Sequence, residues 1–88
     1  MKRRPATIED TKDLMLSEDY KERFIAEFIQ LDIRANKLLK MLNDWKMGKL
    51  KFTPACDYGL LKKQFDLMDE YRMILRVRAQ IEGIKLDL

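Results

Sequence analysis

The chain has 88 residues, the length of one small domain, and its 38% charged and 47% apolar residues are typical of amphipathic helices. Its 18 Lys and Arg against 15 Asp and Glu leave a net charge of +3, which is too small by itself to indicate nucleic-acid binding. The chain has no His, one Cys and three Gly. It therefore lacks the commonest general base, and these residues provide no internal disulfide, thiolate metal cluster or glycine-rich phosphate loop. We therefore expect a protein that is not an enzyme and that holds no cofactor or metal.

Residues 1–16 are expected to form an N-terminal arm or short helix. Thr7-Ile8-Glu9-Asp10 has the Ser/Thr-x-x-acid pattern of a helix start, with Thr7 as the cap. Such a short helix is stable only when it docks, so a mobile tail is the alternative. The start of the chain does not resemble a secretory signal, and no run of residues is long enough for a membrane helix. We expect a cytoplasmic location and no membrane partner.

Residues 17–88 are expected to form one helical hairpin domain, whose first helix spans about 17–46 with Ser17 as N-cap. A helix of this length measures about 45 Å. Polar positions that include Asp32 are expected to face solvent. Apolar residues recur at spacings of four and three, which is the pattern of two helices that pack along their length. This seam consists of Phe24, Phe28, Leu31, Ala35, Leu38, Leu42 and Trp45.

Residues 46–59 interrupt this pattern and connect the two long helices. Gly48 predicts the end of the first helix, and Asp57 is the favoured cap of the second, with Thr53 before Pro54 as the alternative start. Phe52 is expected to close the open end of the hairpin. The second helix is expected over about 57–82, ending near Gly83. Its face toward the first helix consists of Leu61, Phe65, Met68 and Leu75. The predicted fold class is therefore all-α, an antiparallel hairpin.

Each long helix carries more apolar surface than one neighbour covers. Ile25, Ile29 and Ile33 form a second row on the first helix. The second helix carries a second stripe at the same spacing, formed by Leu60, Gln64, Leu67, Tyr71, Ile74, Arg78 and Ile81. Burying one Leu or Ile side chain contributes about 1.5–3 kcal/mol. We therefore expect a helical homo-oligomer; the alternative is a monomer whose N-terminal segment covers the gap.

Basic and aromatic residues flank these stripes. An antiparallel hairpin brings the start of the first helix beside the end of the second, so Tyr20 and Arg23 are expected near Arg76 and Arg78, with Arg72 in the same cluster. Guanidinium groups beside an aromatic ring suit a phosphate-bearing base. The alternative is that these side chains form solvated surface pairs along the first helix. Those pairs would be Arg23 with Glu27 and Gln30 with Arg34.

Two runs of residues, covering about residues 20–80, resemble a known family. The first run is Arg23-x3-Glu27-x3-Leu31-x2-Arg34-x2-Lys37-Leu38. The second run is Leu60-Leu61-x2-Gln64-x3-Met68-x2-Tyr71-x3-Leu75-x2-Arg78. Together they resemble the helical hairpin domain of the phage anti-CBASS and anti-Thoeris sponge proteins, and of small hairpin proteins related to a crAss-like phage product.

The resemblance implies a phage or prophage counter-defence protein in the cytoplasm of the infected bacterial host. Such a protein binds cyclic di- or trinucleotide immune signals without cleaving them and so blocks CBASS-type signalling. The family forms homo-oligomers, typically hexamers, with ligand pockets between protomers. With Tyr20 added for base stacking, the implied ligand-binding residues are Tyr20, Arg23, Glu27, Arg34, Lys37, Gln64, Tyr71 and Arg78.

Two features bear on which ligand the resemblance implies. Arg34 stands where the family usually has Lys, which keeps the charge but changes the geometry of a phosphate contact. Sponges that capture cyclic ADP-ribose derivatives carry a further domain after the hairpin. Its absence from the sequence favours cyclic di- or trinucleotides over that class.

Two other functions are weighed beside this one. The chain is alternatively a non-enzymatic interaction protein whose exposed apolar stripe binds a host or phage protein. A nucleic-acid polymer is the third and least favoured ligand, because no groove-reading motif is present. Its contacts would come from Lys2, Arg3, Arg4, Lys49 and Lys51.

Overall fold

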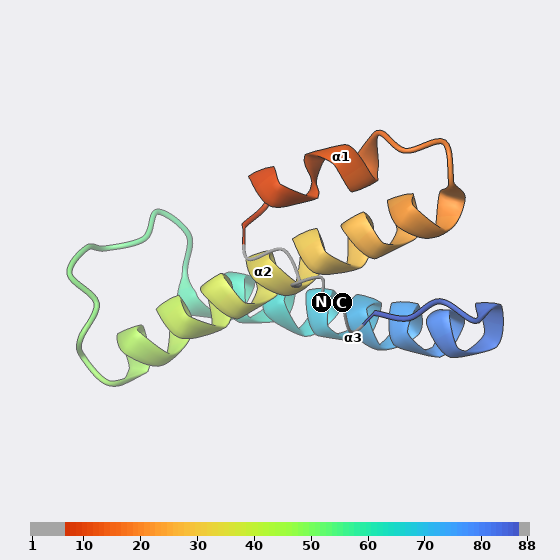
Figure 1. Ribbon diagram of the computed structural model, residues 1–88. Coiled ribbons are helices and arrows are strands. Elements are labelled where there is room, and N and C mark those ends of the chain that lie inside the picture. The colour runs from red at the N-terminus through yellow and green to blue at the C-terminus, as the bar shows by residue number, and fades with distance from the viewer. Residues whose placement is uncertain (1–6, 87–88) are drawn as a thin grey trace.

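The computed structural model describes residues 7–86, which fold into two long helices and a short N-terminal segment. The segment contains a 3-10 helix, η1 (Glu9–Thr11), and a one-turn helix, α1 (Lys12–Met15); the long helices are α2 (Tyr20–Lys46) and α3 (Tyr58–Glu82). In Figure 1, α2 and α3 pack along each other, and α1 lies over the first half of α2. The all-α prediction is confirmed, with no strand among residues 7–86. Expectations for residues 1–6 and 87–88 lie outside the described part of the chain.

The N-terminal arm, residues 7–16, starts as predicted and is docked on α2. The hydroxyl of Thr7 accepts a hydrogen bond from the Asp10 amide at 3.2 Å, and the Asp10 carboxylate accepts one from the Thr7 amide at 3.2 Å. This reciprocal pair is the predicted capping box. Further along, the Gln30 amide donates to the buried Thr11 hydroxyl at 2.8 Å. The arm is therefore fixed by a polar contact as well as by packing.

The predicted N-cap of α2 was wrong by two positions. Asp19, in an extended conformation, is the cap, and its carboxylate accepts a hydrogen bond from the Lys21 amide at 2.9 Å. Ser17 instead accepts from the Asp19 amide and donates to the Glu22 carboxylate at 2.7 Å. Ser and Asp are both good caps, and here Ser17 supports the turn that leads into the helix. The helix consequently begins at Tyr20 rather than at residue 17.

The ends of the connection between the long helices agree with the sequence. The Asp57 carboxylate accepts a hydrogen bond from the Leu60 amide at 3.1 Å and caps α3. Gly48 and Gly83 both have φ of 70°, the left-handed conformation that glycine adopts without strain after a helix. These three residues therefore set where α2 ends and where α3 begins and ends.

Replacing Asp57 by alanine is expected to lower the free energy of unfolding by about 1 kcal/mol, because the amides of the first turn of α3 lose their acceptor. Urea denaturation followed by circular dichroism measures the change. Asp57→Asn is the matched control, since asparagine keeps a side-chain oxygen at the cap and is expected to lose less. Equal stability of the alanine variant and the wild type would contradict the assigned cap.

The seam between α2 and α3 forms the core, as predicted, and the core divides into two clusters. Near the start of α2, Phe24 and Phe28 pack with Leu75 and Ala79. Toward the connection, a second cluster contains Ala35, Leu42 and Phe65, with Leu38, Leu39, Trp45, Tyr58, Leu61 and Met68 around it. Trp45 meets Tyr58 edge to face, with ring centroids 5.4 Å apart. Contacts of the first turns of α2 with the last turns of α3 make the hairpin antiparallel.

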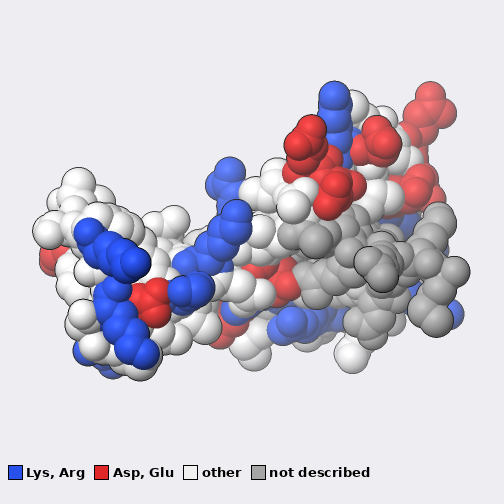
Figure 2. All heavy atoms as spheres, turned by 60° about the vertical axis from the view of Figure 1, so that its left-hand side comes forward, with Lys and Arg blue, Asp and Glu red and all other residues white. Residues whose placement is uncertain are grey.

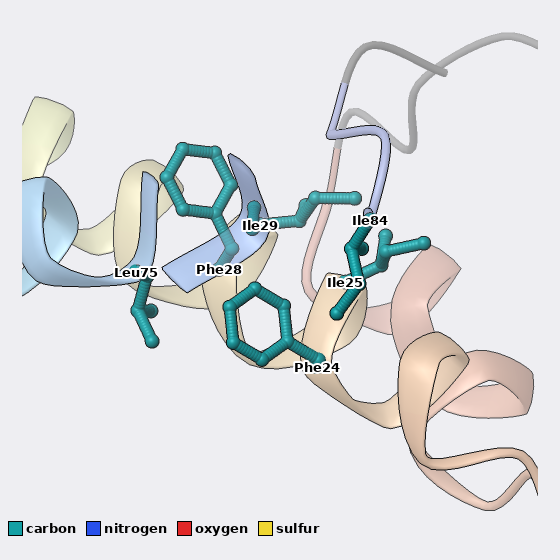
Figure 3. Packing of buried hydrophobic residues seen from close by; sticks show 7 residues of the cluster. Phe24, Ile25, Phe28, Ile29, Leu75 and Ile84 are labelled. Atoms are coloured by element: carbon teal, nitrogen blue, oxygen red, sulfur yellow. The ribbon is translucent and has the colours of Figure 1, made fainter. Parts of the chain in front are cut away.

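The second apolar row of α2 does not need another subunit, contrary to expectation. Ile25 and Ile29 are buried within the single chain. Leu14 of the arm packs against their cluster, and so do Ile84 and Leu86, which follow α3. Figure 3 shows the side chain of Ile84 beside Ile25. The alternative, in which the N-terminal segment covers α2, holds for this row.

Three further expectations were wrong. Asp32 was expected to face solvent and Arg72 to join an accessible guanidinium cluster, but both side chains are buried. Arg72 donates hydrogen bonds to Asp32 and Asn36, both at 2.9 Å, and to Asp69 at 2.8 Å. Its guanidinium therefore joins α3 to α2. Phe52 is 59% exposed and does not close the end of the hairpin. Trp45 and Tyr58 occupy that end instead.

Candidate functional site

The second stripe predicted on α3 is fully accessible in the single chain. We call Leu60, Gln64, Leu67, Tyr71, Ile74, Arg78 and Ile81 the α3 stripe; each of them is exposed. Leu67 and Ile74 are more than half exposed, at 56% and 58%, and Ile81 is 79% exposed. Three residues predicted to bind the ligand therefore lie within an apolar surface that nothing in residues 7–86 covers.

The part of the α3 stripe nearest the connection is hollowed into an open groove of about 590 Å³. Its lining is mostly apolar, and Gln64 and Tyr71 are among the residues that form it. The groove is lined by Cys56, Leu60, Leu61, Lys63, Gln64, Leu67, Met68 and Tyr71. Cys56 and Lys63 were not predicted here. No periodic signal marks Cys56, because it enters the groove from the connection rather than from a helix.

The other five predicted residues lie on α2, and all five are exposed: Tyr20, Arg23, Glu27, Arg34 and Lys37. Arg23 donates to the Ser17 carbonyl at 2.7 Å, and Gln30 donates to the arm at Thr11. Neither of the two solvated pairs considered from the sequence forms among the described residues. The charged groups of Glu27, Arg34 and Lys37 make no ion pair within the described part of the chain.

Helical geometry puts the two groups of residues on the same side of the hairpin. Arg72 and Arg76 reach α2 on one side of the seam, at Asp32 and Phe28. At 3.6 residues per turn, the α3 stripe and the predicted residues of α2 both flank the other side. By their positions along the two helices, all eight predicted residues are therefore assigned to the surface on that side of the seam.

Arg78 links the two helices within that surface. Its guanidinium lies over the Phe24 ring, 4.8 Å from the centroid, and donates to Glu82 at 2.9 Å. Arg76 lies over the Phe28 ring at 5.3 Å, but on the other side, where a second hollow of about 430 Å³ also contains Gln80 and Lys85. Both arginines thus reach aromatic rings of α2, but they face different surfaces. The predicted proximity of Tyr20 and Arg23 to Arg76 and Arg78 stays a prediction.

A single chain does not gather the eight residues into one pocket. Gln64 and Arg78 are fourteen residues apart, about 21 Å along the helix. Tyr20 and Lys37 are spread over a similar length of α2. Gln64 and Tyr71 line the groove, whereas none of the five predicted residues of α2 lines either hollow. The arrangement is a long surface with cations and aromatic rings on it.

The comparison with protein families matches this hairpin. The model of the family described as Sequestin matches residues 18–81. The chain belongs to the Sequestin family. This match confirms the family resemblance seen in the sequence. It spans the Sequestin hairpin from the turn before α2 to the last turn of α3, and excludes the arm.

The name Sequestin indicates that the family sequesters a ligand, which is a binding role rather than a catalytic one. No curated protein and no solved structure matches the chain. Across residues 7–86, the Sequestin chain has no group of three metal-ligating side chains. In the same residues, neither long helix is apolar enough over a sufficient length to cross a bilayer.

Proposed function

We propose that this Sequestin protein binds cyclic di- or trinucleotide immune signals and holds them without cleaving them. In this role it is a phage or prophage counter-defence protein that acts in the cytoplasm of the infected host and blocks CBASS-type signalling. The observation that carries the proposal is the family match over the hairpin, which contains all eight predicted residues. A protein that lowers the free concentration of a signal needs affinity and abundance but no catalytic group.

The chemistry of the exposed surface supports a ligand with phosphates and bases. Arg23, Arg34 and Lys37 supply cations on α2, and arginine holds phosphate oxygens through paired N–H donors. Tyr20 and Tyr71 are exposed aromatic rings on which bases stack. The Gln64 amide, at the groove, both donates and accepts hydrogen bonds and suits the edge of a base.

Self-association is the second part of the proposal. The α3 stripe leaves Leu67, Ile74 and Ile81 in water, although each such side chain contributes about 1.5–3 kcal/mol when buried. Burial against another copy removes this cost and brings a second set of Arg and Tyr side chains to the ligand. We propose a homo-oligomer with the ligand between copies; the hexamer is the number that the family resemblance implies.

Calorimetric titration with a panel of cyclic di- and trinucleotides tests the proposal. Replacing Arg34 by alanine is expected to weaken binding about 10–150-fold, because a hydrogen bond to a charged group contributes about 1.5–3 kcal/mol. Lys40→Ala is the matched control. Lys40 is an exposed cation of the same helix, but it pairs with Asp44 at 2.8 Å and lies on another face. The affinity of the Lys40→Ala variant for the cyclic nucleotide is expected to equal that of the wild type.

Absence of binding to every member of the panel would contradict the proposed function. So would equal losses in the Arg34 and Lys40 variants, which would indicate a general charge effect. The alternative function, an interaction protein, is favoured by the apolar character of the groove and the α3 stripe. It predicts one stoichiometric protein partner in a pull-down and no change in melting temperature with any cyclic nucleotide.

A further inference from the structure

The connection between α2 and α3 presents apolar side chains that the core does not use. In Figure 1 it loops out from the end of the hairpin as the green segment. Met47 is 58% exposed and Phe52 is 59% exposed, and Leu60, in the first turn of α3, is 58% exposed. We call residues 46–63 the tip; they comprise the connection and the residues of α2 and α3 that adjoin it.

Lysines are interleaved with these apolar side chains. Residues 46–52 read Lys-Met-Gly-Lys-Leu-Lys-Phe. Residues 40–66, a span that takes in the tip and the nearest ion pair on each side of it, hold six lysines and three aspartates, with no arginine or glutamate. The span therefore has a net charge of +3. Figure 2 shows basic side chains gathered at this end of the molecule, with uncharged surface between them.

The three aspartates do not neutralise the lysines of the connection. Asp44 is paired with Lys40, and Asp57 caps α3. Asp66 is paired with Lys62, and that hydrogen bond raises the pKa of Lys62, which stays protonated. The other lysines of the tip are exposed and make no ion pair among residues 7–86. These are Lys46, Lys49, Lys51 and Lys63.

Exposed apolar side chains between unpaired lysines are typical of a segment that binds an anionic membrane surface. The ammonium groups are attracted to anionic headgroups, and the apolar side chains enter the boundary between headgroups and acyl chains. The lysine stem is apolar, so it lies in that boundary while its charged end stays in water. Among the described residues, the backbone amides of residues 50–53 donate no hydrogen bond. Because such groups are not tolerated in hydrocarbon, the contact has to be shallow.

Two other anionic partners fit the tip less well. A nucleic acid would be contacted by the lysines, but the connection has no helix or strand that could enter a groove. Contact with phosphates would also leave Met47 and Phe52 in water. An acidic protein surface matches the charge, but its carboxylates are held best by the paired N–H donors of arginine. No arginine occurs in residues 35–71.

We propose that the tip binds the surface of an anionic phospholipid bilayer, with Met47 and Phe52 at the headgroup boundary and the unpaired lysines on the headgroups. In the proposed cytoplasmic location, the contact holds the hairpin at the inner leaflet, whose anionic lipids give it a negative surface potential. The expectation of no membrane partner rested on the lack of a spanning run, which a surface contact does not need. None of the eight candidate ligand-binding residues lies in the tip, so the contact needs no bound nucleotide.

Co-sedimentation of the ligand-free full chain with vesicles tests this contact. The vesicles consist of phosphatidylcholine alone or of phosphatidylcholine with phosphatidylglycerol, which is anionic. The wild type is expected to bind the anionic vesicles and to dissociate as salt is added, because ions screen the lysines. Lys49→Gln with Lys51→Gln is expected to weaken binding about 30-fold, since each lysine near the surface contributes about fivefold. Phe52→Ser is expected to weaken it about 5–10-fold, because the ring no longer leaves water.

Matched controls come from outside the tip. Lys21→Gln with Lys85→Gln changes the net charge by the same amount, and both lysines are exposed. Leu16→Ser removes an apolar side chain that is 68% exposed and precedes α2. Both controls are expected to bind anionic vesicles as the wild type does. Urea denaturation of the tip variants is expected to match the wild type within about 0.5 kcal/mol, since the replaced side chains are exposed.

The inference is overturned by a wild type that does not bind anionic vesicles, by equal binding to neutral vesicles, or by equal losses in the tip and control variants. Retention of the chain on duplex DNA or on polyglutamate, without binding to vesicles, also overturns it. Titration of cyclic nucleotides into the tip variants separates this contact from the proposed function, because these variants are expected to bind nucleotide as the wild type does. Vesicle binding without any nucleotide binding removes the proposed ligand and leaves the membrane contact standing.

Discussion

Replacing Arg72 by methionine is expected to lower the free energy of unfolding by about 3–5 kcal/mol, because it removes the partner of a buried charge. The Arg72 guanidinium joins Asp32 and Asn36 on α2 to Asp69 on α3, with all three distances between 2.8 and 2.9 Å. Its side chain is only 9% exposed. Methionine fills much of the same volume but donates no hydrogen bond to the Asp32 carboxylate.

Urea denaturation measures this loss, and Arg78→Met is its matched control. Arg78 lies on the same helix and pairs with Glu82, but its side chain is about half exposed. Surface pairs of this kind contribute less than about 1 kcal/mol, so the control is expected to remain close to the wild type. The double variant Asp32→Leu with Arg72→Met is expected to recover much of the stability. Equal denaturation midpoints for the Arg72 and Arg78 variants would contradict a structural role for Arg72.

Replacing Leu75 by alanine is expected to lower the free energy of unfolding by about 2–5 kcal/mol. Leu75 is 1% exposed and packs in the cluster that contains Phe24 and Phe28. Truncation removes buried methyl groups and leaves a cavity between two rigid helices. The cluster also holds Ile84, which follows α3, so the loss is expected to loosen the return of the chain after α3 onto α2.

Leu67→Ala provides the control for this prediction on the same helix. Leu67 is 56% exposed in the single chain, so the same truncation is expected to change the stability of the dilute monomer by no more than about 0.5 kcal/mol. Urea denaturation of both variants at the same low protein concentration gives the comparison. A Leu67 variant as unstable as the Leu75 variant would contradict the exposure of the α3 stripe.

The elements that depend on local signals could be predicted from the sequence. The spacing of four and three that runs from Phe24 to Trp45 identified the seam, since side chains that far apart share one face of a helix. Asp57 and Gly83 marked the ends of α3 because their capping chemistry acts within one turn. Ser17 shows the limit of such signals. Two good caps stood two residues apart, and local pattern did not distinguish them.

Contacts between distant parts of the chain could not be predicted. Asp32 reads as a solvent-facing residue on α2, and only its register with Arg72, forty residues away, makes it a buried partner. Ile25 and Ile29 read as an interface between copies, because the sequence does not show that the arm and Ile84 fold back onto them. Both errors have the same cause: periodicity defines a face but does not identify what covers it.

The candidate site, too, could be predicted only in part from the sequence. Periodicity correctly predicted that Gln64, Tyr71 and Arg78 share an exposed stripe, because they recur every seven residues on one helix. It did not predict the groove, which depends on the path of the connection at Cys56. Nor did it show that one chain spreads the eight residues over most of the hairpin. That separation is a property of the folded chain, and it makes a second copy part of the proposed site.

Recovery of the ligand tests the central claim, binding without cleavage, most directly. The purified protein is incubated with each cyclic di- and trinucleotide, freed of unbound ligand by filtration, and then denatured by heat. We predict that at least one cyclic nucleotide is retained and that chromatography and mass spectrometry of the released material find it chemically intact. Retention of no member of the panel, or release of a linear or otherwise altered nucleotide, would contradict the account.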